Sequence, residues 1–207
     1  MNQPVLSRQE PRRLRTRAAL LRAGAELLAD RSIDAIAINE IVDHAGVAKG
    51  SFFNHFTDKD DFADAIAFGI RQAVEVRIDA ANEGVTDPAL RISRGIRGFV
   101  EFALAEPRDA RVMLRRASRA AHADHPLNRG LRTDLAAGAA TGQFRIPSID
   151  ASVLYVIGVC QTLLAAVVER ELEQDAADRL TREVLAMLLC GLGMNAQDAA
   201  KITRRDS

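Results

Sequence analysis

The spacing of proline limits where helices of this chain can begin. Proline is tolerated in the first turn of a helix and excluded from its interior. No proline lies between Pro11 and Pro88, and Pro88, Pro107, Pro126 and Pro147 then follow at intervals of 19, 19 and 21 residues. Alternating runs of β-branched residues, which would indicate strands, are absent. The sequence therefore predicts an all-α fold of about nine helices.

Apolar residues recur three and four positions apart, which sets the expected extent of each helix. Asp87 and Ser148 precede two of the expected helices and are suitable N-caps, and Gly84 marks the end of the longest helix. The expected helices cover residues 11–30, 38–45, 48–55, 58–82, 88–105, 107–121, 126–141, 149–170 and 175–194.

Composition excludes several classes of protein. Lys and Arg together number 28, as do Asp and Glu, so the chain carries no overall charge that would attract polyanions. Two cysteines among 207 residues exclude a disulfide scaffold and a multi-cysteine zinc site. The first residues contain no apolar segment typical of a signal peptide. We expect a soluble cytoplasmic protein with no metal and no cofactor.

Positive charge gathers near the N-terminus. Six arginines lie between Arg8 and Arg22 against a single acid, Glu10, which gives this segment a local charge of +5. Such a segment leading into a helix is typical of phosphate binding, and a solvated tail is the alternative.

The last two expected helices contain long uncharged runs. No charge occurs at residues 151–168 or 184–197. The first run is interrupted by polar side chains and the second is too short to span a membrane, so a membrane span is the weaker interpretation. A helix that is apolar on all sides needs cover on all sides. The runs therefore predict a dimer in which helices 149–170 and 175–194 pack against those of a second copy.

The segment HAGVAKGSFFNHFTDK, residues 44–59, has the form of a helix-turn-helix. Gly46 lies where the chain must reverse, and a positive φ is expected there because glycine adopts it at least cost. Ile41, Ala45, Val47 and Phe52 supply the contacts that would hold the two short helices together. The second helix is then free to enter the major groove of DNA.

This segment resembles the signature of the tetracycline-repressor (TetR) family, and the likeness extends over about residues 12–66. The resemblance implies a homodimeric transcriptional regulator, usually a repressor, that releases a palindromic operator when a small, mostly apolar ligand binds. It implies a flexible basic arm at 1–11, a helix-turn-helix DNA-binding domain of three helices at 12–57, a helical ligand-binding and dimerisation domain at 58–197 and a tail at 198–207.

The resemblance also implies which residues meet DNA. Groove contacts are expected from Lys49, Ser51, Phe53 and Asn54, and phosphate contacts from Asn39, His55 and Lys59. The local excess of arginine adds Arg12, Arg13 and Arg15 as further DNA contacts. Two positions depart from the signature, because Ala48 replaces Ser or Thr and Phe53 replaces Tyr. These departures motivate the alternative of a helical ligand-binding or scaffolding dimer that has lost specific DNA binding.

Other residues admit both a functional and a packing interpretation. Bulky side chains of the middle helices are either ligand contacts or core, namely Phe99, Phe102, Met113, Leu131 and Tyr155. Ser51, His55 and Asp58 superficially suggest a catalytic triad, but no oxyanion hole accompanies them, so we expect no enzyme. His122 and His125, with Asp124 between them, suggest either metal ligands or a polar helix junction. Cys160 and Cys190 are expected to be buried apolar residues rather than a redox switch.

Overall fold

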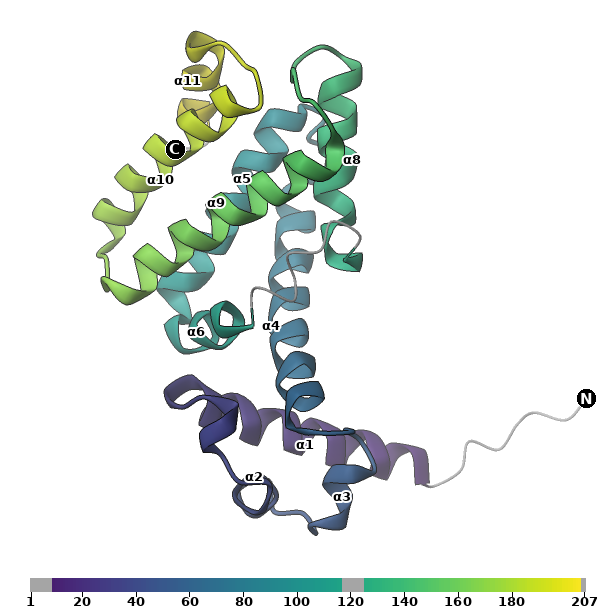
Figure 1. Ribbon diagram of the computed structural model, residues 1–207. Coiled ribbons are helices and arrows are strands. Elements are labelled where there is room, and N and C mark those ends of the chain that lie inside the picture. Colours follow the sequence, from purple (N-terminus) through teal and green to yellow (C-terminus); the bar gives the residue numbers. More distant parts are fainter. Residues whose placement is uncertain (1–8, 117–124, 206–207) are drawn as a thin grey trace, which may run out of the picture. The chain divides into compact units, whose positions relative to one another are not determined.

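The computed structural model describes residues 9–116 and 125–205, and within these ranges it contains helices and no strand (Figure 1). The all-α prediction is confirmed. The α-helices are α1 (Gln9–Asp30), α2 (Ile38–His44), α3 (Gly50–Phe53), α4 (Lys59–Ala81), α5 (Pro88–Ala105), α6 (Pro107–Arg115), α8 (Arg129–Ala140), α9 (Ile149–Glu169), α10 (Gln174–Gly191) and α11 (Ala196–Arg205). Two short 3-10 helices accompany them, η1 (Ile33–Ala35) and η2 (Pro126–Asn128).

The helix starts follow the capping chemistry in the sequence. Asp87 Oδ1 accepts hydrogen bonds from Ala89 N at 3.0 Å and Leu90 N at 3.4 Å, at the start of α5. Ser148 Oγ accepts one from Ala151 N at 3.1 Å, at the start of α9. Both N-caps satisfy backbone donors that have no partner within their own helix. Proline begins α5, α6 and η2, as its spacing predicts.

Three elements differ from the sequence expectation. The helix expected at 48–55 is reduced to α3, which has no side-chain cap because Ala48 and Lys49 offer no acceptor at its start. The helix expected at 126–141 opens with η2 rather than with an α-helical turn. The tail expected at 198–207 is wrong over most of its length, because α11 runs to Arg205 and Asn195 Oδ1 caps it by accepting from Asp198 N at 2.9 Å.

Some sequence expectations lie outside the described residues. These are the basic arm up to Arg8, the end of the helix expected at 107–121, and His122 and Asp124.

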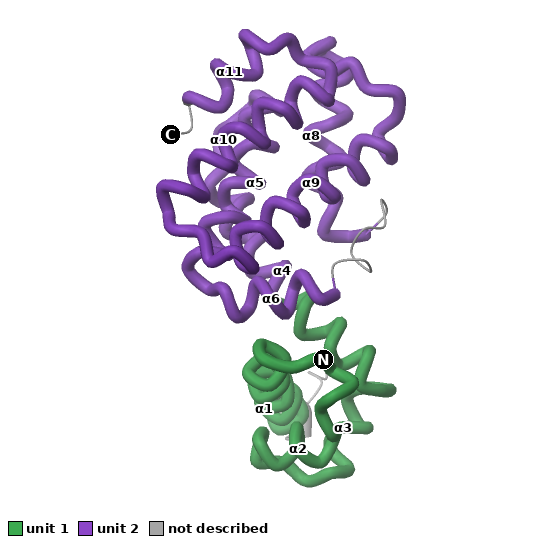
Figure 2. The backbone as a smooth tube through the Cα atoms, turned by 60° about the vertical axis from the view of Figure 1, so that its left-hand side comes forward, with its two compact units in different colours: residues 1–69 green, residues 70–207 purple. Residues whose placement is uncertain are grey.

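The chain divides into two compact units, residues 1–69 and 70–207, which are coloured separately in Figure 2. The division falls within α4 rather than at 57/58, where the sequence places the domain boundary. In the first unit three buried rings form the centre of the core. The Phe62 centroid lies 5.2 Å from that of Phe52 and 4.9 Å from that of Phe56, both in edge-on geometry.

The second unit is built around α5, which packs against α6, α8, α9, α10 and α11. Its core takes Val74 and Ile78 from α4 and aliphatic residues from the surrounding helices. By length and composition alone α9 could cross a membrane. In the structure it packs against α5, α6, α8 and α10 and buries side chains such as Val153, Val156 and Leu164 among them.

Candidate DNA-binding surface and ligand cavity

The turn between α2 and α3 depends on Gly46. This residue has φ +65°, which confirms the positive φ expected there. Gly46 N donates to Asp43 O at 3.1 Å and Val47 N donates to Val42 O at 3.0 Å. This is the paired hydrogen-bond pattern of a Schellman motif, which ends α2 and reverses the chain.

The segment after this turn, residues 48–56 (the α3 segment), has one buried side and one exposed side. Phe52 and Phe56 are buried against the core of the first unit. Ser51 and His55 are half-buried, so they lie at the edge of that contact. The exposed residues of this segment are Ala48, Lys49, Gly50, Phe53 and Asn54. Phe53 is 58% exposed, a large apolar side chain held in solvent beside a lysine and an asparagine.

Arginines of α1 lie close to the end of this segment. The guanidinium carbon of Arg17 lies 5.3 Å from the centre of the Phe56 ring, within the range of a cation–π contact. Burial, and then the charges of Arg13 and Arg17, lower the pKa of His55 below its usual value. The positively charged residues of α1 and the exposed side of the α3 segment therefore belong to the same unit, the first. Sequence reasoning did not select Arg17, although its spacing of four from Arg13 places both on one face of α1.

The remaining residues predicted to contact DNA have different surroundings. Arg12, Arg13, Arg15 and Asn39 are exposed. Lys59 Nζ instead donates to three backbone oxygens, those of Ile33 and Ile36 at 3.0 Å and that of Asp34 at 3.2 Å. An ammonium has three donors, so these carbonyls engage all of them. In the structure Lys59 therefore ties η1 to the start of α4, and its expected phosphate contact stays a prediction.

Asp58 has a structural role at the same helix start. Its Oδ1 accepts a hydrogen bond from Asp61 N at 2.8 Å, and Asp61 Oδ2 accepts one from Thr57 N at 2.9 Å. Asp58 thus caps α4, and Asp61 reaches back to the backbone of Thr57, the residue before this cap.

The second unit contains a cavity of about 130 Å³. Its wall is mostly apolar and comes from α4, α5, α6, α8 and α9. Phe99, Met113 and Leu131, three of the residues considered from the sequence as ligand contacts, line it.

Phe102 and Tyr155 do not line this cavity. Phe102 is 5% exposed and belongs to the core. Tyr155 lies on the outer side of α9 over Gly191, where an added Cβ would lie 2.8 Å from its Cζ. Its neighbours Val156 and Ile157 line the cavity, and successive residues of a helix point about 100° apart.

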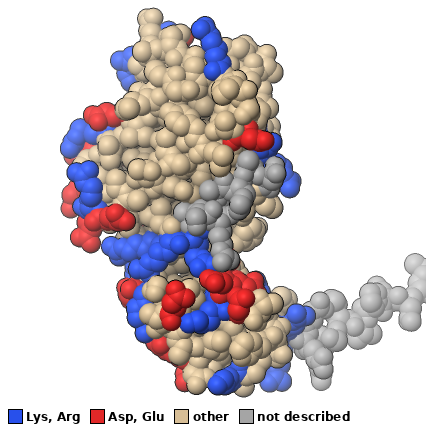
Figure 3. Space-filling view, viewed as in Figure 1, with Lys and Arg blue, Asp and Glu red and all other residues tan. Residues whose placement is uncertain are grey.

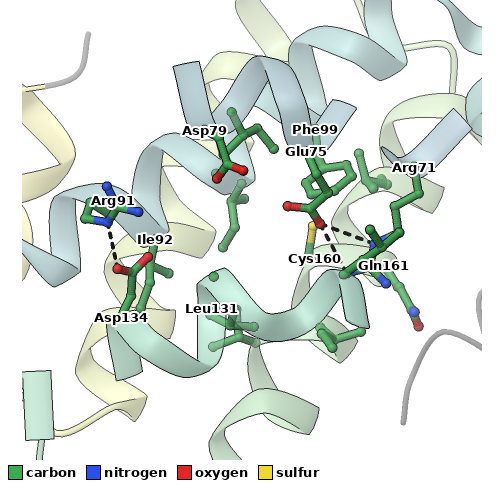
Figure 4. Close-up of a pocket in the computed structure, with 18 of the residues that line it drawn as sticks. Arg71, Glu75, Asp79, Arg91, Ile92, Phe99, Leu131, Asp134, Cys160 and Gln161 are labelled. Atoms are coloured by element: carbon green, nitrogen blue, oxygen red, sulfur yellow. Dashed lines mark hydrogen bonds and ion pairs between the residues drawn. The ribbon is translucent and has the colours of Figure 1, made fainter. Parts of the chain in front are cut away.

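The cavity wall also holds charged side chains that sequence reasoning missed (Figure 4). Arg71 Nη2 lies 3.3 Å from Glu75 Oε1, and Arg91 Nε donates to Asp134 Oδ1 at 2.6 Å. Burial raises the pKa of both Glu75 and Asp134, although the neighbouring arginine opposes the shift in each case. The spacing of Arg71, Glu75 and Asp79 was the available signal, since residues four apart share one face of a helix.

Cys160 lines the cavity, whereas Cys190 is exposed on α10, so the expectation that both are buried is wrong for Cys190. Burial raises the pKa of Cys160 to about 12. In a Cys190→Ser background we expect Cys160 to react with a thiol reagent at pH 8 at least a thousandfold more slowly than free cysteine, because about a thousandfold less thiolate is present. Stopped-flow absorbance with a disulfide reagent measures this, and reaction at the rate of free cysteine would contradict it.

Among residues 9–116 and 125–205, no group of three or more His, Cys, Asp or Glu side chains could hold a metal ion.

Comparisons with known proteins cover both units. Residues 20–66 match the family profile "Bacterial regulatory proteins, tetR family", and residues 87–205 match "Tetracyclin repressor-like, C-terminal domain". The transcriptional regulator AcuR of Cereibacter sphaeroides is 39% identical over 67 residues, a match covering 28% of this chain and 31% of AcuR. YwcC of Bacillus subtilis, an uncharacterized HTH-type transcriptional regulator, is 48% identical over 40 residues, covering 19% of this chain and 18% of YwcC. The chain thus matches less than a third of either relative's length.

Solved structures share the fold over most of the chain. RolR in complex with resorcinol has a TM-score of 0.65 and 24% identity, covering 95% of this chain and 96% of RolR. A putative tetR family transcription regulator from Shewanella sp. PV-4 has a TM-score of 0.75 and 17% identity, covering 86% and 97%. FadR from Bacillus subtilis in complex with stearoyl-CoA has a TM-score of 0.67 and 16% identity, covering 84% and 98%. Because the two family profiles together span most of the sequence, this chain belongs to the tetR family and is a helix-turn-helix, DNA-binding transcriptional regulator.

Proposed function

We propose that this regulator is a cytoplasmic, dimeric repressor that binds a palindromic operator and releases it when a small molecule enters the cavity of the second unit. The observation that carries the proposal is the α3 segment, where Lys49, Phe53 and Asn54 are exposed while Phe52 and Phe56 hold the opposite side in the core. Lysine can read guanine edges, asparagine can read adenine edges, and a phenyl ring can contact a thymine methyl group.

An uncovered apolar face supports the dimer. Leu154 on α9 is 51% exposed, Tyr155 is 38% exposed, and Met187 on α10 is 73% exposed. Figure 3 shows a broad surface without charged residues over α9. A second copy would bury these side chains, and two DNA-binding units would then meet two half-sites of an operator.

The cavity supports a ligand response, since it lies within the unit that carries this apolar face. RolR and FadR, which share the fold, have solved structures with resorcinol and with stearoyl-CoA. A ligand releases DNA only if it binds more tightly to the conformation that does not fit the operator.

Operator binding is tested with DNA from beside the protein's own gene, by fluorescence anisotropy over a range of salt concentrations. We expect specific binding that weakens with salt, and a Lys49→Ala, Asn54→Ala double variant at least about thirtyfold weaker, since each base contact contributes about 1–3 kcal/mol. Lys201→Ala, which removes an exposed lysine of α11 in the second unit, is the matched control and should leave affinity unchanged.

Two results would contradict this proposal. If the DNA is bound no better than random sequence, a ligand-binding or scaffolding dimer becomes the better description. If the double variant retains full affinity, the groove assignment of Lys49 and Asn54 is wrong.

A further inference from the structure

The size of the cavity limits what it can hold. A volume of about 130 Å³ is close to that of an engineered cavity of about 150 Å³ that binds benzene in another protein. The cavity therefore has room for a molecule of about one ring. The aromatic ring of Phe99 and the apolar side chains of Ile92 and Leu131 supply apolar contacts for the ring of such a molecule.

Hydrogen-bond acceptors, the carboxylates of Glu75 and Asp134, lie at two separate places on the cavity wall. In Figure 4 the Arg71–Glu75 pair and the Arg91–Asp134 pair lie at opposite sides of the cavity, with Leu131 between them. Asn82 adds a third acceptor from the end of α4. It is 3% exposed, its Nδ2 donates to Arg91 O at 3.3 Å, and its Oδ1 is buried without a hydrogen bond in the structure. An acceptor of this kind calls for a donor.

The cationic groups of the wall are already engaged. Arg71 donates to Glu75 and, at 2.6 Å, to Asn128 Oδ1. Arg91 donates to Asp134 and to the backbone oxygens of Asn82 at 3.1 Å and Val85 at 3.3 Å. An anionic ligand would have to break these pairs or face three wall carboxylates, those of Glu75, Asp79 and Asp134.

A cationic ligand is disfavoured as well. Glu75 and Asp134 each already have an arginine partner, so an added cation would lie close to a guanidinium at either side of the cavity. The remaining carboxylate, that of Asp79, is exposed and screened by water. A neutral donor makes use of the free carboxylate lone pairs without disturbing either ion pair.

We infer that the cavity binds a compact, uncharged, single-ring molecule with a hydrogen-bond donor at each of two ends, one directed to Glu75 and the other to Asp134 and Asn82. This inference rests on the proposed function in one respect, that the cavity is the site of the effector. Burial raises the pKa of Glu75 and Asp134, and hydrogen bonds from such donors would favour their ionised forms.

The test is isothermal titration calorimetry of the full chain with matched single-ring probes. Benzene-1,3-diol and benzene-1,4-diol are neutral with two donors, 1,3-dimethoxybenzene has none, isophthalate is a dianion and benzylammonium is a cation. We expect at least one diol to bind at least tenfold more tightly than the diether and either ion. No binding by either diol at millimolar concentration, or equal or tighter binding by the diether or an ion, would overturn the inference.

Variants then locate the donors. Glu75→Gln and Asp134→Asn keep the side-chain shape and should each weaken the better diol at least about tenfold. Glu101→Gln, which neutralises an exposed acid of α5 outside the cavity, is the control and should bind as the parent does. Circular dichroism confirms that each variant is folded, and unchanged diol affinity in both folded cavity variants would overturn the inference.

These measurements need no DNA, so the two proposals fail separately. Operator binding without diol binding refutes the ligand class and leaves the regulator intact. Diol binding without operator binding refutes the proposed function and leaves the cavity chemistry standing.

Discussion

Met187→Glu is expected to convert the proposed dimer into monomers. Met187 of α10 is 73% exposed and belongs to the apolar face that it shares with Leu154 and Tyr155 of α9, and a twofold interface there would bring in the same carboxylate from each copy. Burying an unpaired charge in an interface costs several kcal/mol, and about 4 kcal/mol corresponds to about a thousandfold weaker association. Since the two subunits of a dimer bind a palindrome together, one at each half-site, the affinity for the operator should fall at least about a hundredfold.

Sedimentation velocity at micromolar concentration measures the dimer, and fluorescence anisotropy measures operator affinity. Val76→Glu is the matched control, because Val76 is an apolar side chain of α4 that is 64% exposed and lies outside α9 and α10. It should remain a dimer. A Met187→Glu protein that sediments as a dimer would show that the two copies associate through another surface.

The sequence was sufficient where one local interaction determines the structure. Pro88 with the Asp87 cap places the start of α5, and Gly46 determines the reversal before α3 through its own backbone conformation. The apolar pattern did not predict α11, because the start of this helix is marked by a polar cap, Asn195 with Asp198.

The DNA-binding surface and the cavity differed in how much could be foreseen. A helix-turn-helix is a short, continuous segment, so residues such as Lys49 and Asn54 could be selected from spacing and resemblance. The cavity is formed by residues distant in sequence, and the Arg91–Asp134 pair joins positions 43 apart. Its lining was predicted from bulk and from position in the middle helices, and neither property distinguishes Phe99 at the cavity from Phe102 in the core. The carbonyl contacts of Lys59 could not be foreseen either, because a lysine beside a DNA-binding motif can bind backbone carbonyls as well as phosphate.

Gly24→Leu is expected to destabilise the first unit while leaving the second unchanged. Gly24 is a buried residue of α1 at its contact with α4, where an added Cβ would lie 2.6 Å from Ile66 Cδ1 and even closer to the Phe62 ring. Phe62 is fully buried and its ring contacts those of Phe52 and Phe56, so moving it would disturb the packing of all three rings. Overpacking of this kind costs about 3 kcal/mol, which corresponds to roughly a hundredfold increase in opening.

Hydrogen exchange followed by mass spectrometry separates the two units. Amides of residues 9–69 should exchange roughly a hundredfold faster in Gly24→Leu, whereas those of α5 and α9 should be unchanged, and operator binding should be lost. Gly69→Leu is the control, because it makes the same substitution in α4 at an exposed site where nothing lies within 4 Å of the added Cβ. Equal protection of residues 9–69 in the two variants would contradict this prediction. It would mean that α1 and α4 can move apart to admit the leucine without loss of stability. Faster exchange throughout the chain would mean that the two units unfold together, so that a core defect on the DNA-binding side also opens the ligand cavity.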